Sequence, residues 1–290
     1  MNTLWQDIKI KMLHSGSRLG LLIGINIIIF LAINIPGVLS WAFTGHNLVS
    51  GYAFDYLALP AYLPKLLSRF WTPFTYMLMH DGILHIFFNM LWLYWIGQIF
   101  EEYLGNKRTI GLYIFGGLTG ALFFVLAYNY LPVFANSGAA EGTTVVGASA
   151  SVMAIIIGTA TLLPDYTISM MFIGPVKLKW IAIFYVLLDF LLIAGPNGGG
   201  EIAHLGGALF GFIYIKQLQR GHDWIGAING IFKSRSKMKV AVKNSDRNSN
   251  SKPRQDEIDR ILDKISQTGY ESLNKQEKEI LFRASKDNEG

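Results

Sequence analysis

Residues 145 to 154 read VVGASASVMA, and an apolar run at 147–163 begins within them that is long enough to lie in a membrane. Ser149 and Ser151 stand there among small residues. Serines and small residues in an apolar helix let two membrane helices approach closely, so helix packing is one interpretation of this stretch. The other interpretation is that one of the serines is a nucleophile. The choice depends on which polar groups share their depth in the membrane.

The composition of the chain, taken as a whole, is apolar. The 290 residues are 51% hydrophobic and 16% charged, whereas soluble domains carry about 25% charged residues. We therefore predict an all-α polytopic membrane protein. Six apolar segments are candidate transmembrane helices: 19–39, 83–100, 110–131, 147–163, 180–194 and 203–219. Several are near or below the ~20 residues that a crossing requires, so we expect short or tilted helices.

The basic residues predict the orientation, because Lys and Arg concentrate in cytoplasmic loops. They occur in the amino-terminal stretch 1–18, in the loops 101–109 and 164–179, and in the tail, whereas the loops 132–146 and 195–202 contain none. We expect both termini to be cytoplasmic, in the plasma (inner) membrane. The second, fourth and sixth helices then start at the outer face. The net charge of +5 follows from the loops and tail, so no nucleic acid partner is expected, and the lack of cysteine excludes thiol chemistry.

Composition divides the chain into four segments. We predict a cytoplasmic segment at 1–18, a six-helix membrane domain at 19–219, a polar basic linker at 220–253 and a cytoplasmic helical hairpin at 254–290. In the hairpin, Asn274 with Glu277 three residues later is typical of a helix start. A hairpin this short needs a surface against which to bury its apolar stripe. It either binds a cytoplasmic partner or is a solubilising tail, and the sequence leaves both open.

Polar residues mark the starts of the three helices that begin at the outer face. His85 and Asn89 are four residues apart in the second helix and therefore lie on one face. Ser149 and Ser151 begin the fourth helix, and His204 lies in the first turn of the sixth. Each has a structural interpretation when taken alone: helix packing, an interhelical hydrogen bond, or a satisfied histidine near the interface.

The shared depth of these groups favours chemistry, because polar groups in lipid are costly. A serine and a histidine suit nucleophilic attack with general-base assistance. A second histidine and an amide can donate hydrogen bonds to an oxyanion. Gly207 and Gly211 form a GxxxG pattern after His204, so the fourth and sixth helices are expected to pack closely. Water must reach such a site, and we expect a cavity open to the outside that His80 also lines.

These residues resemble the rhomboid family of intramembrane serine proteases. The match rests on GASAS at 147–151 for the family's GxS motif, AHLGGALFG at 203–211 for AHxxGxxxG, and HDGILHIFFN at 80–89 for HxxxN. The resemblance covers roughly 19–219 in the six-helix form of the fold. It implies that Ser149 is the nucleophile and His204 its general base, in a dyad without an acidic third member. It also implies that His85 and Asn89 line the oxyanion hole and that the substrates are transmembrane helices, with no metal or organic cofactor.

Two positions depart from the family pattern, because Ala150 stands where the family usually has glycine and Thr72 follows Trp71 where the family commonly has arginine. Asp189 in the fifth helix is either a hidden third catalytic member or, as we expect, a carboxylate bonded to backbone or water near the interface. The alternatives to a protease are an inactive rhomboid-like protein that binds transmembrane helices and a membrane transporter.

Overall fold

The computed structural model describes residues 17–170, 173–231 and 255–287. The chain divides into two compact units, residues 1–234 and 235–290, and each is described by itself. Residues 1–16 of the predicted segment 1–18 and most of the predicted linker 220–253 lie outside the described residues.

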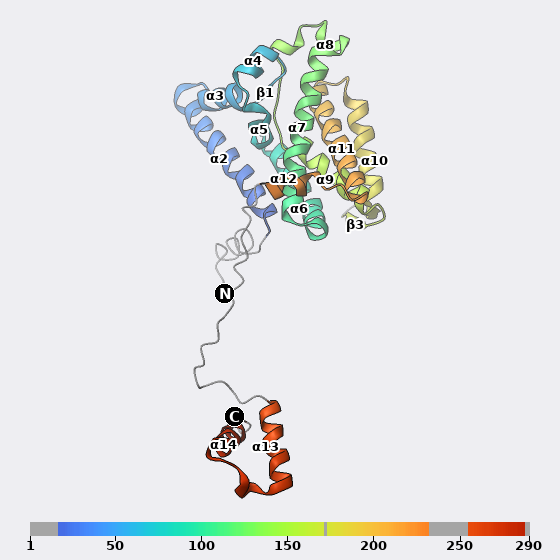
Figure 1. The fold of residues 1–290 in the computed structure, drawn as a ribbon. Helices are drawn as coiled ribbons and strands as arrows, with labels where there is room; N and C mark the ends of the chain where they lie inside the picture. The colour runs from blue at the N-terminus through green and yellow to red at the C-terminus, as the bar shows by residue number, and fades with distance from the viewer. Residues whose placement is uncertain (1–16, 171–172, 232–254, 288–290) are drawn as a thin grey trace. The chain divides into compact units, whose positions relative to one another are not determined.

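Long helices build the N-terminal unit (Figure 1). Six of them coincide with the six apolar segments of the sequence: α2 (Leu19–Thr44), α6 (Ile83–Leu104), α7 (Asn106–Tyr130), α9 (Ser149–Leu162), α10 (Leu178–Leu192) and α11 (Gly198–Gln219). Among the described helices, α2, α6 and α7 are long and apolar enough to cross a membrane, and α9 is a shorter apolar helix. The protein is thus a mostly helical membrane protein, while six crossings remain a prediction.

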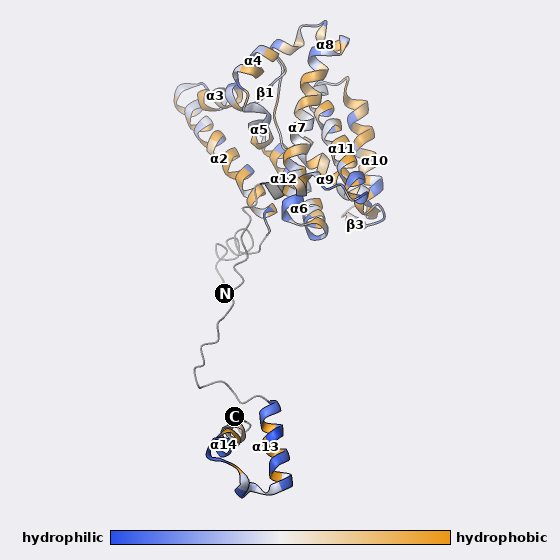
Figure 2. Ribbon diagram, viewed as in Figure 1, coloured by the Kyte–Doolittle hydropathy of each residue, from blue (hydrophilic) through white to orange (hydrophobic). Residues whose placement is uncertain are grey.

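Hydrophobic residues predominate along these helices (Figure 2), and many of the large ones are exposed. On α2, Ile28 is 65% exposed and Phe43 is 88% exposed, although both are large hydrophobic residues. A soluble protein seldom leaves such a surface open to water, whereas in lipid it is the stable arrangement. The exposed apolar faces therefore agree with the composition in indicating a membrane protein.

Helix α9 lies at the centre of the unit and packs against α6, α7 and α11. Every residue of α9 from 150 to 160 is buried. Its Ala, Gly, Ser and Thr residues lack bulk, and neighbouring helices can approach it on several sides. The helix that begins with Ser149 is therefore the most enclosed of the bundle, and the side chains at its start are held by contacts from several elements.

The segment between α2 and α6 folds against the bundle as short elements. These are α3 (Leu48–Leu57), β1 (Leu59–Pro60), α4 (Leu63–Ser68), α5 (Thr72–Thr75) and the 3-10 turn η2 (Tyr76–Leu78). Arg69 forms an ion pair with Asp55 at 2.9 Å and stacks over the Tyr56 ring. Trp71 Nε1 donates to Tyr56 O at 2.8 Å. Arg69 thus orders this loop, although Thr72 replaces the arginine that commonly follows the family's tryptophan.

Two short antiparallel sheets join the helices. Before α9, the chain forms α8 (Pro132–Ala135), η3 (Ala139–Glu141) and β2 (Thr144–Val145), and β2 pairs with β1. Between α9 and α10, β3 (Thr167–Met170) pairs with β4 (Gly174–Lys177). Asp165 in this connection forms ion pairs with Lys177 and Lys179. The connection that the sequence presents as a loop is therefore a hairpin.

The structure departs from the sequence prediction at the start of α11 and in the segment that follows this helix. The helix begins at Gly198, five residues before the predicted start, and Gly198, Gly199 and Gly200 are all buried in it. A Cβ on Gly199 would lie 2.8 Å from the Phe124 ring, so these glycines serve close packing rather than a loop. After α11, α12 (Trp224–Ile231) occupies part of the predicted linker. Ile225 is buried at Gly111 of α7, so the N-terminal unit extends beyond residue 219.

The C-terminal unit contains α13 (Gln255–Thr268), η4 (Tyr270–Ser272) and α14 (Lys275–Asp287). Asn274 and Glu277 form the reciprocal cap that the sequence predicts, with each side chain accepting the other's backbone N–H at 2.8 Å. Ile261 and Leu273 are buried between the helices, while Phe282 is 69% exposed. The hairpin therefore has a small core of its own, and its location in the cell remains a prediction.

Candidate active site

The chain enters α9 through a fixed turn that places Ser149 as the first helical residue. β2 ends at Val145, and the Gly147 N–H donates to Tyr76 O at 2.9 Å. Gly147 has φ +130°, in the region that favours glycine. The first N–H groups of a helix have no partner within it, so those at the start of α9 are available to an anion. Ser149 thus stands beside hydrogen-bond donors of the backbone.

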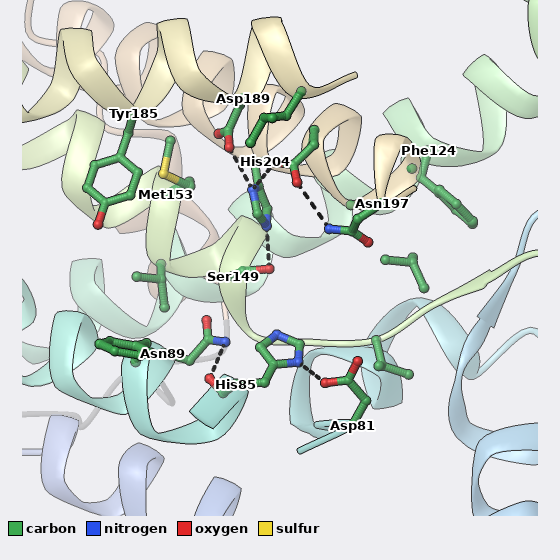
Figure 3. A pocket seen from close by; sticks show the side chains of 18 of the residues that line it. Asp81, His85, Asn89, Phe124, Ser149, Met153, Tyr185, Asp189, Asn197 and His204 are labelled. Atoms are coloured by element: carbon green, nitrogen blue, oxygen red, sulfur yellow. Dashed lines mark hydrogen bonds and ion pairs between the residues drawn. The ribbon is translucent and has the colours of Figure 1, made fainter. Parts of the chain in front are cut away.

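Ser149 Oγ and His204 Nε2 are joined by a hydrogen bond of 2.6 Å (Figure 3). The two residues come from α9 and α11, which pack without side chains between them. A Cβ on Gly207 would lie 2.0 Å from Ala150 O, and one on Gly211 would lie 2.2 Å from Ala154 O. This confirms the close approach that the GxxxG pattern predicts. His204 lies in the second turn of α11 rather than the first, because the helix starts early.

The other nitrogen of His204 faces two carboxylates. Nδ1 is 3.1 Å from Asp189 Oδ1 and 3.3 Å from Glu201 Oε2. Asn197 Nδ2 donates to Glu201 Oε1 at 3.1 Å. The expectation that Asp189 bonds only to backbone or water is therefore wrong. The chain also has two clustered carboxylates among its apolar helices, whereas the sequence suggests none.

Glu201 escaped the sequence analysis, although a signal was present. It precedes His204 by three residues, and such a pair meets on one face of a helix. Because 195–202 was interpreted as a loop, the helical spacing was not applied to it. Asp189 could not be paired in the same way, since its contact to His204 is made between two helices and depends on the face that α10 turns inward.

His85 and Asn89 lie on the other side of Ser149 from His204 (Figure 3). His85 Nδ1 is 2.5 Å from Asp81 Oδ1, a partner that the sequence analysis did not identify. A Cβ on Gly147 would lie 2.8 Å from His85 Nε2 and 3.4 Å from Ser149 Oγ. The bare backbone of Gly147 therefore leaves a gap between these two atoms. Asn89 Nδ2 donates to His85 O at 2.9 Å, and its second N–H is not engaged by that bond.

Two predicted polar residues lie away from this gap. Ser151 is completely buried and its Oγ is 2.5 Å from the point that a Cβ on Gly117 would occupy, so it faces α7. His80 was expected to line the cavity, but it is 2% exposed and is not a lining residue. Its ring packs edge to face against His85 with centroids 5.1 Å apart. The His85 ring takes the position at the cavity wall, and His80 lies behind it.

A cavity of about 700 Å³ joins the groups on both sides of Ser149. Residues of six elements line it, and the polar ones include Asp81, His85, Asn89, Thr143, Thr144, Ser149, Asp189, Asn197, Glu201 and His204. Apolar side chains such as Met153 and Tyr185 line the same space (Figure 3). The cavity can thus place a polar group and a water molecule beside Ser149, next to an apolar surface.

Within the described residues, Asp189, Glu201 and His204 are the group whose ligand atoms lie close enough to hold a cation, within 4.8 Å of one another. A bound cation would need His204 Nδ1, which already hydrogen bonds to Asp189 Oδ1 and lies 3.3 Å from Glu201 Oε2. Nε2 of the same ring is bonded to Ser149. Hydrogen bonding accounts for this cluster, and the arrangement offers a base beside a hydroxyl group.

Comparison with known proteins agrees with the motifs. The family model described as the rhomboid domain matches residues 67–220, just over half of the chain. A family of unknown function matches residues 244–287. The chain is 30% identical over 161 residues to "RHOMBOID-like protein 12, mitochondrial" of Arabidopsis thaliana. That alignment covers 53% of this chain and 48% of the relative, so the chain spans about half the length of the curated relative it matches.

The domain match contains each of the motifs at 80–89, 147–151 and 203–211. The helices that carry these motifs meet at one cavity, with the serine and the histidine in hydrogen-bond contact. The chain belongs to the rhomboid family.

Proposed function

We propose that this protein is an intramembrane serine endopeptidase that cleaves transmembrane helices of other membrane proteins near the outer face. The observation that carries the proposal is the 2.6 Å hydrogen bond between Ser149 Oγ and His204 Nε2 at the wall of a cavity of about 700 Å³. An inactive relative that only binds helices has no need of a base aligned on a hydroxyl group at the start of a helix.

The proposed reaction begins with attack of Ser149 Oγ on a peptide carbonyl carbon. The hydroxyl proton passes to His204 Nε2 as the new C–O bond forms, and His204 then delivers that proton to the leaving amine as the C–N bond breaks. A water molecule then attacks the ester carbonyl carbon and gives a proton to His204 Nε2. As the ester C–O bond breaks, His204 returns this proton to Ser149 Oγ, and the acid product leaves. The first transfer needs an unprotonated Nε2 within reach of Ser149 Oγ, which lies 2.6 Å away, and the second uses the proton that Nε2 has just accepted.

The oxyanion of the intermediate is assigned to the gap in front of Gly147. The first N–H groups of α9 have no partner within the helix, and His85 and Asn89 lie beside the start of α9. Donation from His85 Nε2 to the oxyanion, while Nδ1 of the same ring donates to Asp81, requires the imidazolium form with a proton on both nitrogens. We assign His85 and Asn89 as donors to the oxyanion, in addition to the backbone.

A substrate helix has to unwind before its peptide bond can reach Ser149, because its carbonyl groups are hydrogen-bonded within the helix. Helices that carry glycine, proline or other helix breakers near the outer face are therefore the proposed substrates. The apolar walls beside Met153 and Tyr185 suit the side chains of such a segment, and the polar groups suit its exposed backbone.

The experiment uses the purified protein, a reporter helix in detergent and a fluorophosphonate that reacts with nucleophilic serines. Wild-type protein should cleave the reporter and be labelled at Ser149. Ser149→Ala should eliminate both signals, whereas Ser151→Ala should keep both, because Ser151 faces α7. Labelling that survives in Ser149→Ala and disappears in Ser151→Ala would contradict the assignment of Ser149 as the nucleophile. A wild-type protein that neither cleaves the reporter nor reacts with the fluorophosphonate would contradict the proposed protease function.

The proposed location is the plasma (inner) membrane with both termini cytoplasmic, on the basis of the Lys and Arg distribution. The relative from Arabidopsis thaliana is named as mitochondrial, which concerns that protein. Because the chain contains no cysteine, single variants such as Ser137→Cys and Ser272→Cys can be labelled from outside with an impermeant maleimide. Only the Ser137→Cys variant is expected to be labelled. Labelling of Ser272→Cys alone would show that the orientation is opposite to the proposed one.

A further inference from the structure

The two nitrogens of the His204 ring face different partners. Nε2 is bonded to Ser149 Oγ at 2.6 Å, and Nδ1 lies 3.1 Å from Asp189 Oδ1 and 3.3 Å from Glu201 Oε2. A neutral imidazole carries one N–H, and ionised carboxylates only accept hydrogen bonds. Two acceptors at Nδ1 therefore hold the proton on that nitrogen. Nε2 is left as an acceptor towards Ser149, which is the form of the ring that a base requires.

Two helices supply the carboxylates, and both groups are buried. Asp189 comes from α10 with its side chain 6% exposed, and Glu201 comes from α11 with its side chain 11% exposed. Asn197 holds the far oxygen of Glu201 at 3.1 Å. Burying a carboxylate among membrane helices costs free energy. Two carboxylates directed at one ring nitrogen therefore indicate a function for the pair. A helix cap does not provide one, because Asp189 lies inside α10 rather than at its start.

We propose that Asp189 and Glu201 are positioning residues that act on the reaction through His204, so that this chain works with a serine, a histidine and an acidic pair rather than with a dyad. The proposal rests on the proposed protease function. The ligand atoms of Asp189, Glu201 and His204 lie within 4.8 Å of one another. The acidic pair therefore places negative charge beside Nδ1 of the ring.

That charge matches what the reaction creates. When Ser149 Oγ attacks, its proton moves to Nε2 and the ring becomes an imidazolium with one positive charge. The Nδ1 proton stays between the ring and the carboxylates, and no proton leaves the cluster. A negative charge already in place stabilises the imidazolium without any reorganisation of water.

Other titratable groups line the same cavity. They are Tyr185 from α10, Tyr128 from α7, and the His85 and Asp81 pair at the start of α6. Within the described part of the chain, Asp189 and Glu201 are the charged groups that form ion pairs with His204. The pH dependence of the reaction should therefore report on these two carboxylates before any other group.

The test compares the full-length wild type with Asp189→Asn, Glu201→Gln and the double variant. For each, the fluorophosphonate labelling rate of Ser149 is measured across pH, together with kcat and KM on the reporter helix. Removing both carboxylates should lower kcat on the order of 10³-fold with little change in KM. The acidic limb of the labelling profile should move to lower pH by about one unit or more, because the carboxylates no longer favour the protonated ring. Each single variant keeps one acceptor and should show a smaller effect of both kinds.

Asp165→Asn is the matched control, since it makes the same substitution in an exposed hairpin carboxylate that is paired with Lys177 and Lys179. It should leave the labelling profile unchanged. Asp189→Glu should restore part of the rate lost in Asp189→Asn, because it returns a carboxylate. If the double variant does not fold, the two single variants decide.

The two proposals fail in different ways. Wild-type protein that is active, together with folded variants whose acidic limb and rate equal those of the wild type, would overturn the acidic pair and leave the protease intact. A uniform loss of rate in Asp189→Asn with an unmoved limb would make Asp189 a packing residue and would overturn the proposal as well. Wild-type protein without labelling at Ser149 would instead remove the protease function itself.

Discussion

Two histidine–carboxylate pairs flank Ser149, and they differ in their surroundings. In both, a carboxylate faces Nδ1 and Nε2 is directed to the serine side. The His204 and Asp189 side chains are 19% and 6% exposed, whereas those of His85 and Asp81 are 29% and 62% exposed. Charge pairs interact strongly where water is excluded and weakly where solvent and salt screen them. The same chemical pair should therefore contribute much more at His204 than at His85.

The largest expected difference separates the histidines themselves. His204→Ala removes the base, so reporter cleavage should fall to the level of Ser149→Ala. His85→Ala removes one of several proposed donors to the oxyanion, and losing one donor costs on the order of 10²- to 10³-fold in rate. Steady-state cleavage of the reporter helix measures both. Equal losses in the two variants would erase the distinction between base and donor.

Gly147→Ala should have the next largest effect. The new methyl group would meet His85 Nε2 at 2.8 Å, and φ +130° disfavours any residue except glycine. We expect a loss on the order of 10²-fold in cleavage, comparable with the loss of one oxyanion donor. Gly142→Ala is the control, because a Cβ there meets nothing within 4 Å. A fully active Gly147→Ala protein would show that the gap in front of Gly147 is not used.

Asp81→Asn tests the weaker pair directly. Because the Asp81 side chain is 62% exposed, we expect cleavage to fall less than about tenfold, in keeping with the small contribution of exposed ion pairs. The difference from wild type should shrink as the salt concentration rises. Cleavage rates at low and high salt measure this. A loss as large as that of the Asp189 and Glu201 double variant would show that exposure does not rank the two pairs.

The smallest effect should belong to a carboxylate far from either histidine. Arg69 and Lys65 hold the pKa of the Asp55 carboxyl below its usual range through hydrogen bonds. A lowered pKa in the folded state adds stability above the ordinary value of 3.8, and this stability is lost as pH falls through the folded pKa. Asp55→Asn should therefore lower Tm slightly at pH 7 and by a smaller amount at pH 3, with cleavage unchanged. Thermal unfolding at the two pH values checks the sign, and an equal Tm difference at both would contradict it.

The sequence predicted the helices well because an apolar stretch in a membrane protein has few alternatives to a helix. It failed where the local signal opposed the tertiary contact. Gly198, Gly199 and Gly200 have low helix propensity, but they form the first turn of α11. A Cβ on Gly199 would meet Phe124, and one on Gly198 would meet Ile193 O. The short helix α12 was missed because its polar surroundings outweighed Ile225, which is buried against α7.

The candidate site divides along the same line. Motif spacing and helix order predicted that Ser149, His204, His85 and Asn89 meet at one cavity, while their roles in the reaction stay predictions. Their acidic partners could not be predicted with equal success. Asp189 meets His204 between two helices, and a sequence does not state which face of α10 points inward. His80 was misplaced for a related reason, since depth alone does not decide whether a ring lies at the cavity wall or behind another ring.

The close contact of α9 and α11 through Gly207 and Gly211 has a mechanical consequence. Because the backbones of α9 and α11 are in direct contact, these two helices are expected to stay together. The proposed substrate helix, entering from the lipid, would then displace another element. α10 carries Asp189 on its inward face and large apolar side chains on its outward face, such as Phe190 at 65% exposure. If α10 swings outward, Asp189 leaves His204, whereas Glu201 stays because it shares a helix with the histidine. The same movement of α10 that would admit a substrate would then also reduce the negative charge beside His204.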